Sequence, residues 1–335
     1  MLKDTIYKIK ILIKINITSI FIGLTVFLFS CNKQPEAVGQ EVSQTSTVSN
    51  LPDTGQTASY TSTKGEDADY LINPMSFTDN NNGTITDNFT GLMWQKTDGG
   101  EMVFESTASY VKALNIGGFN NWRLPTSHEL FLINSYDNVN PALNTTYFTK
   151  TLAEYWWTSD LRADDAALVW VVNAGGGIGA HPKSETVSAG GSKKFHVRAV
   201  RNPTIVTLPA IHFKDNGNGS ITDNYTGLIW QKIQSSNAMT WEEALTYAEN
   251  LSLAGATDWR LPNVKELQSL NDEKLFKPSF NKTFFTNALS GNYWSSTTLV
   301  NSTDKAWDIN LDYGIISYNA KTTKENVLCV RGGTN

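Results

Sequence analysis

The side chains best suited to chemistry are oxygen ligands in a motif that the chain carries twice. The first copy places Asp79, Asn81 and Asp87 around a glycine-centred turn, and the second places Asp215 and Asp223 at matching positions. Oxygen ligands at such odd spacings occur in calcium-binding loops, although no bidentate glutamate follows at the twelfth position. The alternative is a hairpin whose Asp and Asn side chains bond to their own backbone. Calcium is therefore a possible cofactor, and the sequence indicates no other.

A second possible chemistry is the binding of sulfated sugars by basic side chains beside aromatic rings. Point charges next to stackable rings suit such ligands. The alternative is a solvated surface with a flexible loop. The candidate ligand-binding residues are Lys183, Lys193, Lys194 and Arg198, in or beside a glycine-rich insertion, and Lys274, Lys277 and Lys282, around Phe276 and Phe280.

Catalysis is not indicated by any motif. The histidines His128, His181, His196 and His212 share no metal-ligand spacing, and no P-loop, Gly-x-Ser-x-Gly elbow or dinucleotide fingerprint occurs. Cys329 lies in an apolar run, where a buried and inert thiol is expected. We therefore expect a protein that is not an enzyme, and a hydrolase built on two scattered carboxylates stays open as the less favoured alternative.

A tandem repeat must position these residues. Phe213–Lys232 repeats Phe77–Lys96 almost residue for residue, which indicates a duplicated domain. A chain of 335 residues has room for two ordinary domains. We place the first domain at residues 71–202 and the second at residues 208–335, joined by a short linker bracketed by prolines.

Each repeat has the pattern of an α+β domain, with a hairpin first, then two helices, then several strands. Capping boxes at Thr126–Glu129, Thr240–Glu243 and Asn263–Glu266 predict helix starts. Val103 stands where a capping threonine would be, so we expect a shorter or frayed helix start there. Late alternating segments predict strands. The residues expected to have structural roles are Trp94, Trp122, Arg123, Trp157, Trp230, Trp259, Arg260, Trp294 and Trp307.

The N-terminus has the pattern of a bacterial lipoprotein signal. Residues 1–30 combine lysines with an apolar run, and Cys31 follows a small residue, as a lipidated cysteine would. Residues 31–70 are polar and are expected to form a disordered stalk. These features predict a lipid anchor in a membrane and a location in the bacterial cell envelope, outside the cytoplasm. The net charge of −5 disfavours nucleic acid as a partner.

The order of motifs resembles the C-terminal domain family of the Legionella collagen-like adhesin. These motifs are the Asp/Asn-rich hairpin ending in Trp-Gln-Lys, then Trp-Arg-Leu-Pro, Tyr-Trp, and a closing Val-Arg, and they span both repeats. The resemblance implies two tandem C-type lectin-like domains, each with about two helices and a twisted antiparallel sheet. It also implies adhesion and binding of sulfated polysaccharide. The first repeat departs from the second by a glycine-rich insertion, and no collagen-like repeat is present.

We therefore expect a surface-anchored lipoprotein with two non-catalytic binding modules that act in adhesion or in binding a glycan such as a sulfated polysaccharide. The alternative is a structural lipoprotein of the envelope whose domains bind other proteins. The sequence does not give the ligand or the oligomeric state.

Overall fold

The computed structural model describes residues 51–185, 195–204, 210 and 212–333, all within one compact unit of the chain. The predicted signal peptide and the lipidation site Cys31 lie outside the described residues, as do Lys193 and Lys194. Within the described residues, no helix is long and apolar enough to cross a membrane.

Most of the regular secondary structure in the described residues is strand, and there are four α-helices, two in each repeat. This composition is compatible with the predicted α+β class and with two repeated domains. The elements of the first repeat are β1 (Phe77–Asp79), β2 (Thr84–Asp87), β3 (Met93–Gln95), α1 (Phe104–Ala113), α2 (Ser127–Leu132), β4 (Tyr155–Arg162), β5 (Asp165–Asn173), β6 (Ile178–Pro182), β7 (Phe195–His196) and β8 (Val200–Arg201). Those of the second are β9 (Phe213–Asp215), β10 (Ser220–Asp223), β11 (Leu228–Gln231), α3 (Trp241–Glu249), α4 (Val264–Gln268), β12 (Asn292–Thr298), β13 (Lys305–Asn310), β14 (Ile315–Ala320) and β15 (Val330–Gly332).

Each repeated hairpin forms a small sheet that the end of its own repeat completes. The strand orders are β1-β2-β3-β8 and β15-β11-β10-β9. Trp94 pairs with Val200 in the first repeat, and Trp230 pairs with Val330 in the second. Both tryptophans are fully buried. The hairpin motif therefore closes each repeat around a tryptophan in its core.

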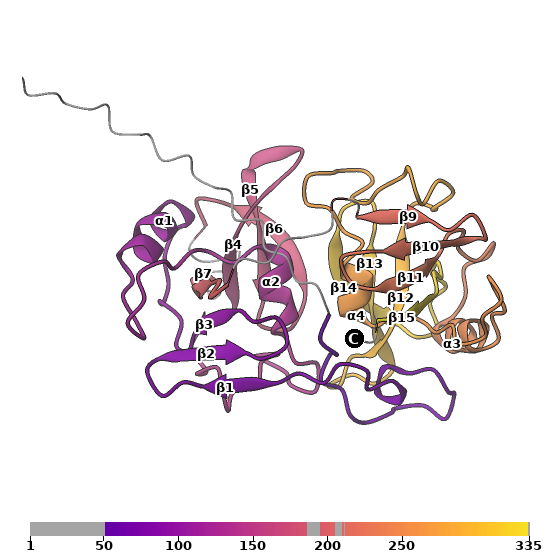
Figure 1. The fold of residues 1–335 in the computed structure, drawn as a ribbon, viewed down its shortest axis with the longest axis horizontal. Coiled ribbons are helices and arrows are strands. Elements are labelled where there is room, and N and C mark those ends of the chain that lie inside the picture. The colour runs from indigo at the N-terminus through magenta and orange to yellow at the C-terminus, as the bar shows by residue number, and fades with distance from the viewer. Residues whose placement is uncertain (1–50, 186–194, 205–209, 211, 334–335) are drawn as a thin grey trace, which may run out of the picture. The chain divides into compact units, whose positions relative to one another are not determined.

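A single seven-stranded sheet crosses both repeats, in the order β12-β13-β14-β6-β5-β4-β7. The joint is an antiparallel pair of β14 with β6, in which Ile316 stands opposite Ile178. These isoleucines are equivalent, because Ile178 pairs with Val172 and Ile316 with Ile309 in corresponding strands. Equivalent residues on adjacent antiparallel strands imply a half-turn about an axis perpendicular to the sheet. In Figure 1 the two small sheets accordingly lie at opposite levels, β1 low on the left and β9 high on the right.

One hydrophobic core runs through the joint between the repeats. It contains Trp170 and Ile178 from the first repeat and Trp307 and Ile316 from the second. A ring contact also crosses the joint, since Tyr136 lies edge-to-face on Trp307 with centroids 5.2 Å apart. Two smaller cores, one in each repeat, lie elsewhere in the molecule and include residues of α1 and α3. The repeats therefore share the largest core, and each also has a smaller core of its own.

The helix starts agree with the capping patterns, with one exception. Thr126 and Asn263 accept hydrogen bonds from the backbone at Glu129 and Glu266, and each glutamate bonds back to the cap. The prediction of a shorter helix after Val103 is wrong. Helix α1 has ten residues and α3 has nine, although Val103 makes no side-chain cap. Packing against the core, with Thr107 and Val111 buried, compensates for the missing cap.

The prediction of a disordered stalk is wrong for residues 51–70. Residues 51–73, here called the N-terminal strap, contain a 3₁₀-helix at Asp67–Asp69 and several fully buried polar side chains. Gln56 donates to the carbonyl of Thr298 at 2.5 Å and accepts from its amide, while the Thr54 carbonyl accepts from the Tyr136 amide at 2.8 Å. The strap thus contacts both repeats. The polar composition predicted disorder because the segment has little apolar surface to bury. Paired hydrogen bonds stabilise the segment instead.

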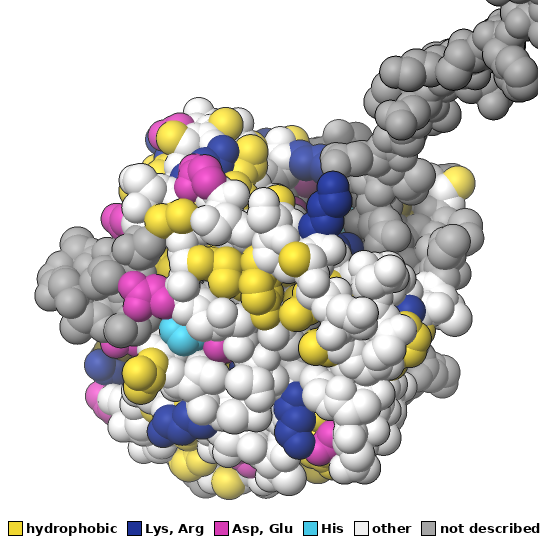
Figure 2. Space-filling model, turned by 90° about the vertical axis from the view of Figure 1, so that its left-hand side faces the viewer, with side chains coloured by type: hydrophobic (Ala, Val, Ile, Leu, Met, Phe, Trp, Pro, Cys, Tyr) yellow, Lys and Arg dark blue, Asp and Glu magenta, His cyan; other side chains and the backbone are white. Residues whose placement is uncertain are grey.

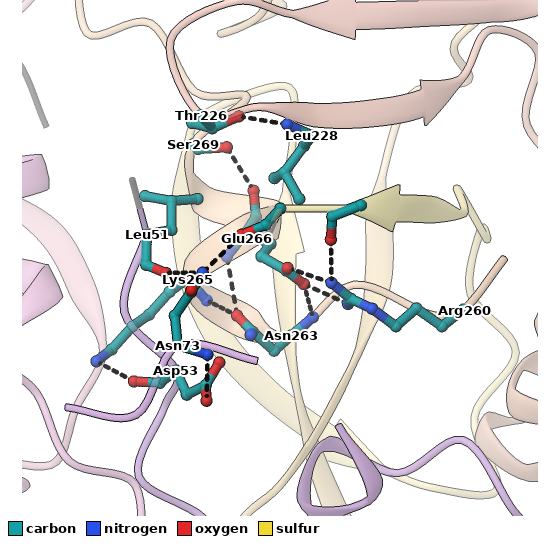
Figure 3. A network of polar contacts seen from close by, with 12 residues as sticks. Leu51, Asp53, Asn73, Thr226, Leu228, Arg260, Asn263, Lys265, Glu266 and Ser269 are labelled. Atoms are coloured by element: carbon teal, nitrogen blue, oxygen red, sulfur yellow. Dashed lines mark hydrogen bonds and ion pairs between the residues drawn. The ribbon is translucent and has the colours of Figure 1, made fainter. Parts of the chain in front are cut away.

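Lys265 lies at the centre of the strap contacts and is almost completely buried (Figure 3). Its ammonium donates to the carbonyls of Asp53 at 2.9 Å and Leu132 at 2.8 Å. Burial lowers the pKa of Lys265 to about 7, against the opposing pull of Asp87, Asp67 and Asp53. This one side chain therefore connects the second repeat to the strap and to the first repeat.

Candidate functional site

The structure does not bring the candidate calcium ligands around one point. The Asp79 carboxylate contacts Lys96 at 2.5 Å and accepts from the Asn81 amide. Asp87 lies at the other end of the hairpin, opposite Phe77, where it accepts from the amides of the following turn. Asp215 and Asp223 repeat these contacts with Lys232 and Tyr225. The geometry favours the self-bonded hairpin.

Metal-ligating side chains do not gather elsewhere in the described residues either, since no group of three or more His, Cys, Asp or Glu could hold an ion. Each histidine instead contacts a carboxylate. The pairs are His128–Glu273 at 2.9 Å, His181–Glu185 at 2.9 Å, His196–Asp98 at 2.8 Å and His212–Asp223 at 3.2 Å.

Arg198 is not a surface ligand-binding residue, so that prediction is wrong. The side chain is fully buried, and its guanidinium donates to the carbonyls of Gln95 and Lys96. Burial lowers its pKa to about 10, although Asp98 at 3.8 Å favours the charged form. Arg198 therefore fixes the core of the first repeat.

The other basic residue of the glycine-rich insertion that the structure describes is Lys183, whose ammonium lies 5.6 Å over the Phe104 ring. Figure 2 shows one face of the molecule, on which lysine and arginine side chains stand apart around a central group of hydrophobic ones. No continuous basic surface is visible on that face.

Around Phe276 the structure does bring basic and aromatic side chains together. The Arg162 guanidinium lies 5.4 Å over the Phe276 ring, and the Lys277 ammonium lies 5.9 Å over Tyr313. The two rings contact each other with centroids 5.5 Å apart. Arg162 comes from the first repeat and the other three from the second. We call these four residues the basic–aromatic patch.

The two remaining candidate lysines are exposed and are not among the patch contacts. Lys274 borders a pocket of about 620 Å³ that also contains His128 and Glu273. Burial alone would lower the pKa of His128, but the Glu273 carboxylate outweighs it and raises this pKa to about 9. Lys282 lies beside Asn281, which lines the same pocket.

A second opening, of about 790 Å³, lies where the two repeats meet, and we call it the junction pocket. Its walls come from a proline loop, from a segment ahead of β4, from the β5–β6 turn, and from β13 and β14 of the second repeat. The residues are Asn140, Pro141, Lys150–Tyr155, Asn173–Gly175, Gly177, Trp307 and Ile316–Tyr318.

The junction pocket and the basic–aromatic patch use equivalent loops of the two repeats. Pro141 and Pro278 occupy matching loops, because Ser135 bonds to Ala142 as Asp272 bonds to Ser279. The glycine-rich turn Ala174–Gly177 corresponds to Leu311–Gly314, where Tyr313 supplies a ring. At Gly176, with φ of +104°, a Cβ would lie 3.2 Å from Tyr136. The glycine-rich turn of the first repeat therefore leaves an opening, whereas Tyr313 fills the equivalent space in the second repeat.

Sequence reasoning identified Lys277 and the glycine-rich turn but missed Arg162, Tyr313, Asn173 and Tyr318. The difference between the two turns was the available signal, because it marks where the copies diverge. The sequence of β14 has no periodicity that would reveal its pairing with β6 across the joint.

Comparison with known proteins was informative at the level of the family. A family model described as the Lcl C-terminal domain matches residues 83–201 and again residues 219–331. A search of curated proteins found no match. The two matches together cover more than half of the chain, one in each structural repeat, and the family is one of adhesin-type domains. The chain therefore belongs to the Lcl C-terminal domain family and carries that domain twice.

Proposed function

We propose that this protein is a surface adhesin-type binding protein, without catalytic activity, that holds a sulfated polysaccharide at its basic–aromatic patch. The observation that supports this most is the meeting of Arg162, Lys277, Phe276 and Tyr313 from both repeats. The Arg162 guanidinium donates to Asp164 through Nε and Nη2, and its other N–H groups can donate two parallel hydrogen bonds to a sulfate. The Lys277 ammonium adds a point charge. The rings offer apolar surface to the sugar between sulfates.

Heparin retention tests this proposal directly. The chain without its predicted signal peptide should be retained at low salt, and both Arg162→Ala and Lys277→Ala should elute at clearly lower salt. Lys112→Ala removes an exposed lysine from α1 and serves as the matched control, with unchanged elution. An unretained protein, or equal elution of all four, contradicts the proposal and leaves a protein ligand as the alternative.

We further propose lipid anchoring at Cys31 and a place in the cell envelope. The lysine-bearing apolar segment followed by Ser30-Cys31 supports this. The full-length protein expressed in bacteria should partition into the detergent phase and incorporate labelled palmitate, whereas Cys31→Ala should do neither. Labelling of Cys31→Ala at the wild-type level would refute the anchor.

We also propose that each repeat has the fold of a C-type lectin-like domain. Two helices and antiparallel sheet in each repeat support it. An experimental structure that fails to superpose on C-type lectin domains would refute it.

A further inference from the structure

We propose that the junction pocket is a second binding site, which takes an uncharged hexopyranose unit. The inference rests on the proposed polysaccharide-binding function but concerns a different opening and a different ligand chemistry. It is supported by the aromatic wall of the pocket, by a prearranged amide donor and by the charge of its lining.

The aromatic wall is Tyr318, which is 46% exposed and held in place by its neighbours. Trp307 lies perpendicular to it, with centroids 5.5 Å apart, and the Lys305 ammonium lies 5.3 Å over its ring. Trp307 is fixed in turn by Tyr136, whose hydroxyl donates to the Gly176 carbonyl at 2.8 Å. Leu152 on the rim is 76% exposed. A fixed, partly exposed ring beside apolar surface suits the C–H face of a pyranose.

The amide donor is Asn173, at the end of β5. Its Oδ1 accepts from the Gly175 amide at 2.9 Å and from the Gly177 amide at 3.1 Å, so the side chain cannot flip without losing both bonds. Its Nδ2 makes no hydrogen bond within the described part of the chain. A Cβ at Gly177 would lie 2.8 Å from this nitrogen, so glycine there leaves the amide its space. The turn thereby directs two donor hydrogens for sugar hydroxyls.

The charge of the lining favours a neutral ligand. Lys150 and Glu154 are the two charged residues of the lining, one of each sign, and its other polar side chains are amides and hydroxyls. The Lys305 ammonium lies outside the lining, over the Tyr318 ring. The basic–aromatic patch instead contains Arg162 and Lys277, both positive, with the Asp164 carboxylate paired to Arg162 at 2.6 Å. A sulfated unit would gain little from a lining of zero net charge, whereas hydroxyl groups can bond to each of these polar side chains.

The symmetry places both sites on one face of the molecule. A half-turn about an axis perpendicular to the sheet keeps equivalent loops on the same side of it, at opposite ends of the β6–β14 pair. Gly177 and Gly314, at the ends of the two turns, lie one and two residues from the Ile178–Ile316 pair, and three residues of strand span about 10 Å. One polysaccharide chain can therefore contact both sites, and the second contact becomes intramolecular.

Saturation-transfer NMR on the chain without its signal peptide tests the inference, with chitotetraose, cellotetraose and maltotetraose as probes. We expect transfer to ring protons of at least one tetraose and a loss of affinity of fivefold or more in Tyr318→Ala. Asn173→Asp keeps the acceptor for the turn but removes the donor, so it should weaken binding similarly while near-ultraviolet circular dichroism stays unchanged.

Heparin elution separates this inference from the proposed function. Tyr318→Ala should leave heparin elution unchanged, and Lys277→Ala should leave tetraose binding unchanged. If no tetraose binds, or if Tyr318→Ala binds as the wild type does, the inference is overturned even where heparin is retained. If a tetraose binds through Tyr318 while heparin is not retained, the patch proposal fails and the junction site stands.

Discussion

At the scale of single residues, equivalent positions in the two repeats have diverged from apolar to acidic. Trp157 and Trp294 are equivalent, since each donates its indole N–H to a methionine carbonyl. Their strand partners are Val171 in the first repeat and Asp308 in the second. Asp308 is fully buried, and the Asn319 amide bridges it to Glu325 at 3.1 and 2.8 Å. The second repeat therefore carries a buried carboxylate pair.

Glu325→Gln should remove a pH dependence of folding stability. Burial, and then the charge of Asp308, raise the pKa of Glu325 to about 8 from its ordinary value of 4.5. A carboxyl with a raised folded pKa contributes stability that is complete below pH 4.5 and lost as pH rises to 8. Urea unfolding should show the wild type losing on the order of 2–4 kcal/mol more than the variant over this range.

Glu105→Gln, on the exposed surface of α1, is the matched control and should follow the wild type. Parallel stability curves for all three proteins between pH 5 and pH 8 would show that Glu325 ionises normally.

At the scale of elements, the sequence predicts those helix starts and those strands that depend on local chemistry. Capping boxes mark the helices after Thr126 and Asn263, and the repeated hairpin marks the small sheets. In each repeat the capping glutamate also binds the arginine of Trp-Arg-Leu-Pro, with Arg123–Glu129 at 2.6 Å. That arginine therefore has both a carboxylate and a carbonyl partner, since Arg123 also donates to the Leu124 carbonyl.

Thr126→Ala should lower the free energy of unfolding by about 1 kcal/mol, the usual value for a lost N-cap. The Thr126 hydroxyl accepts from the Glu129 amide at 3.2 Å, while Asp160 accepts from the neighbouring Ser127 amide and is unaffected by the substitution. Thr126→Ser retains the hydroxyl and should stay close to the wild type in urea unfolding. Equal destabilisation by alanine and serine would instead mean that the threonine methyl group, and not the cap, matters.

The candidate sites could not be predicted in full because they depend on long-range pairing. Tyr318 and Asn173 line the same pocket only because β14 pairs with β6. The same pairing, through the symmetry of the repeats, brings Arg162 to Phe276. Arg198 was misassigned because its burial depends on Asp98, far away in the sequence, and basic residues are usually exposed. Local composition carries no information on either contact.

At the scale of the whole molecule, the strap breaks the symmetry between the two repeats. It covers Lys265 at the start of α4, whereas the equivalent residue of α2, His128, lines an open pocket. In that pocket, Asp160 and Glu273 accept hydrogen bonds from Ser127 at the start of α2. Near the start of α4, it is Asp67 of the strap that accepts from Thr297. The acidic groups near the start of α4 therefore come from the strap, whereas those near the start of α2 come from the two repeats themselves.

Removal of the strap should expose Lys265 to chemical modification. A chain beginning at residue 74 loses the Asp53 carbonyl that accepts from the ammonium, so Lys265 should react with an acylating reagent many times faster than in a chain beginning at residue 45. Peptide mass spectrometry measures this site by site, with the exposed Lys112 as the internal reference. Gln56→Ala in the longer chain breaks the two bonds to Thr298 and a longer one to the Tyr136 carbonyl, and it should give intermediate labelling, since the strap stays attached by Asp53, Asp67 and Asn73. Equal protection of Lys265 in all three proteins would mean that the two repeats bury this lysine without the strap.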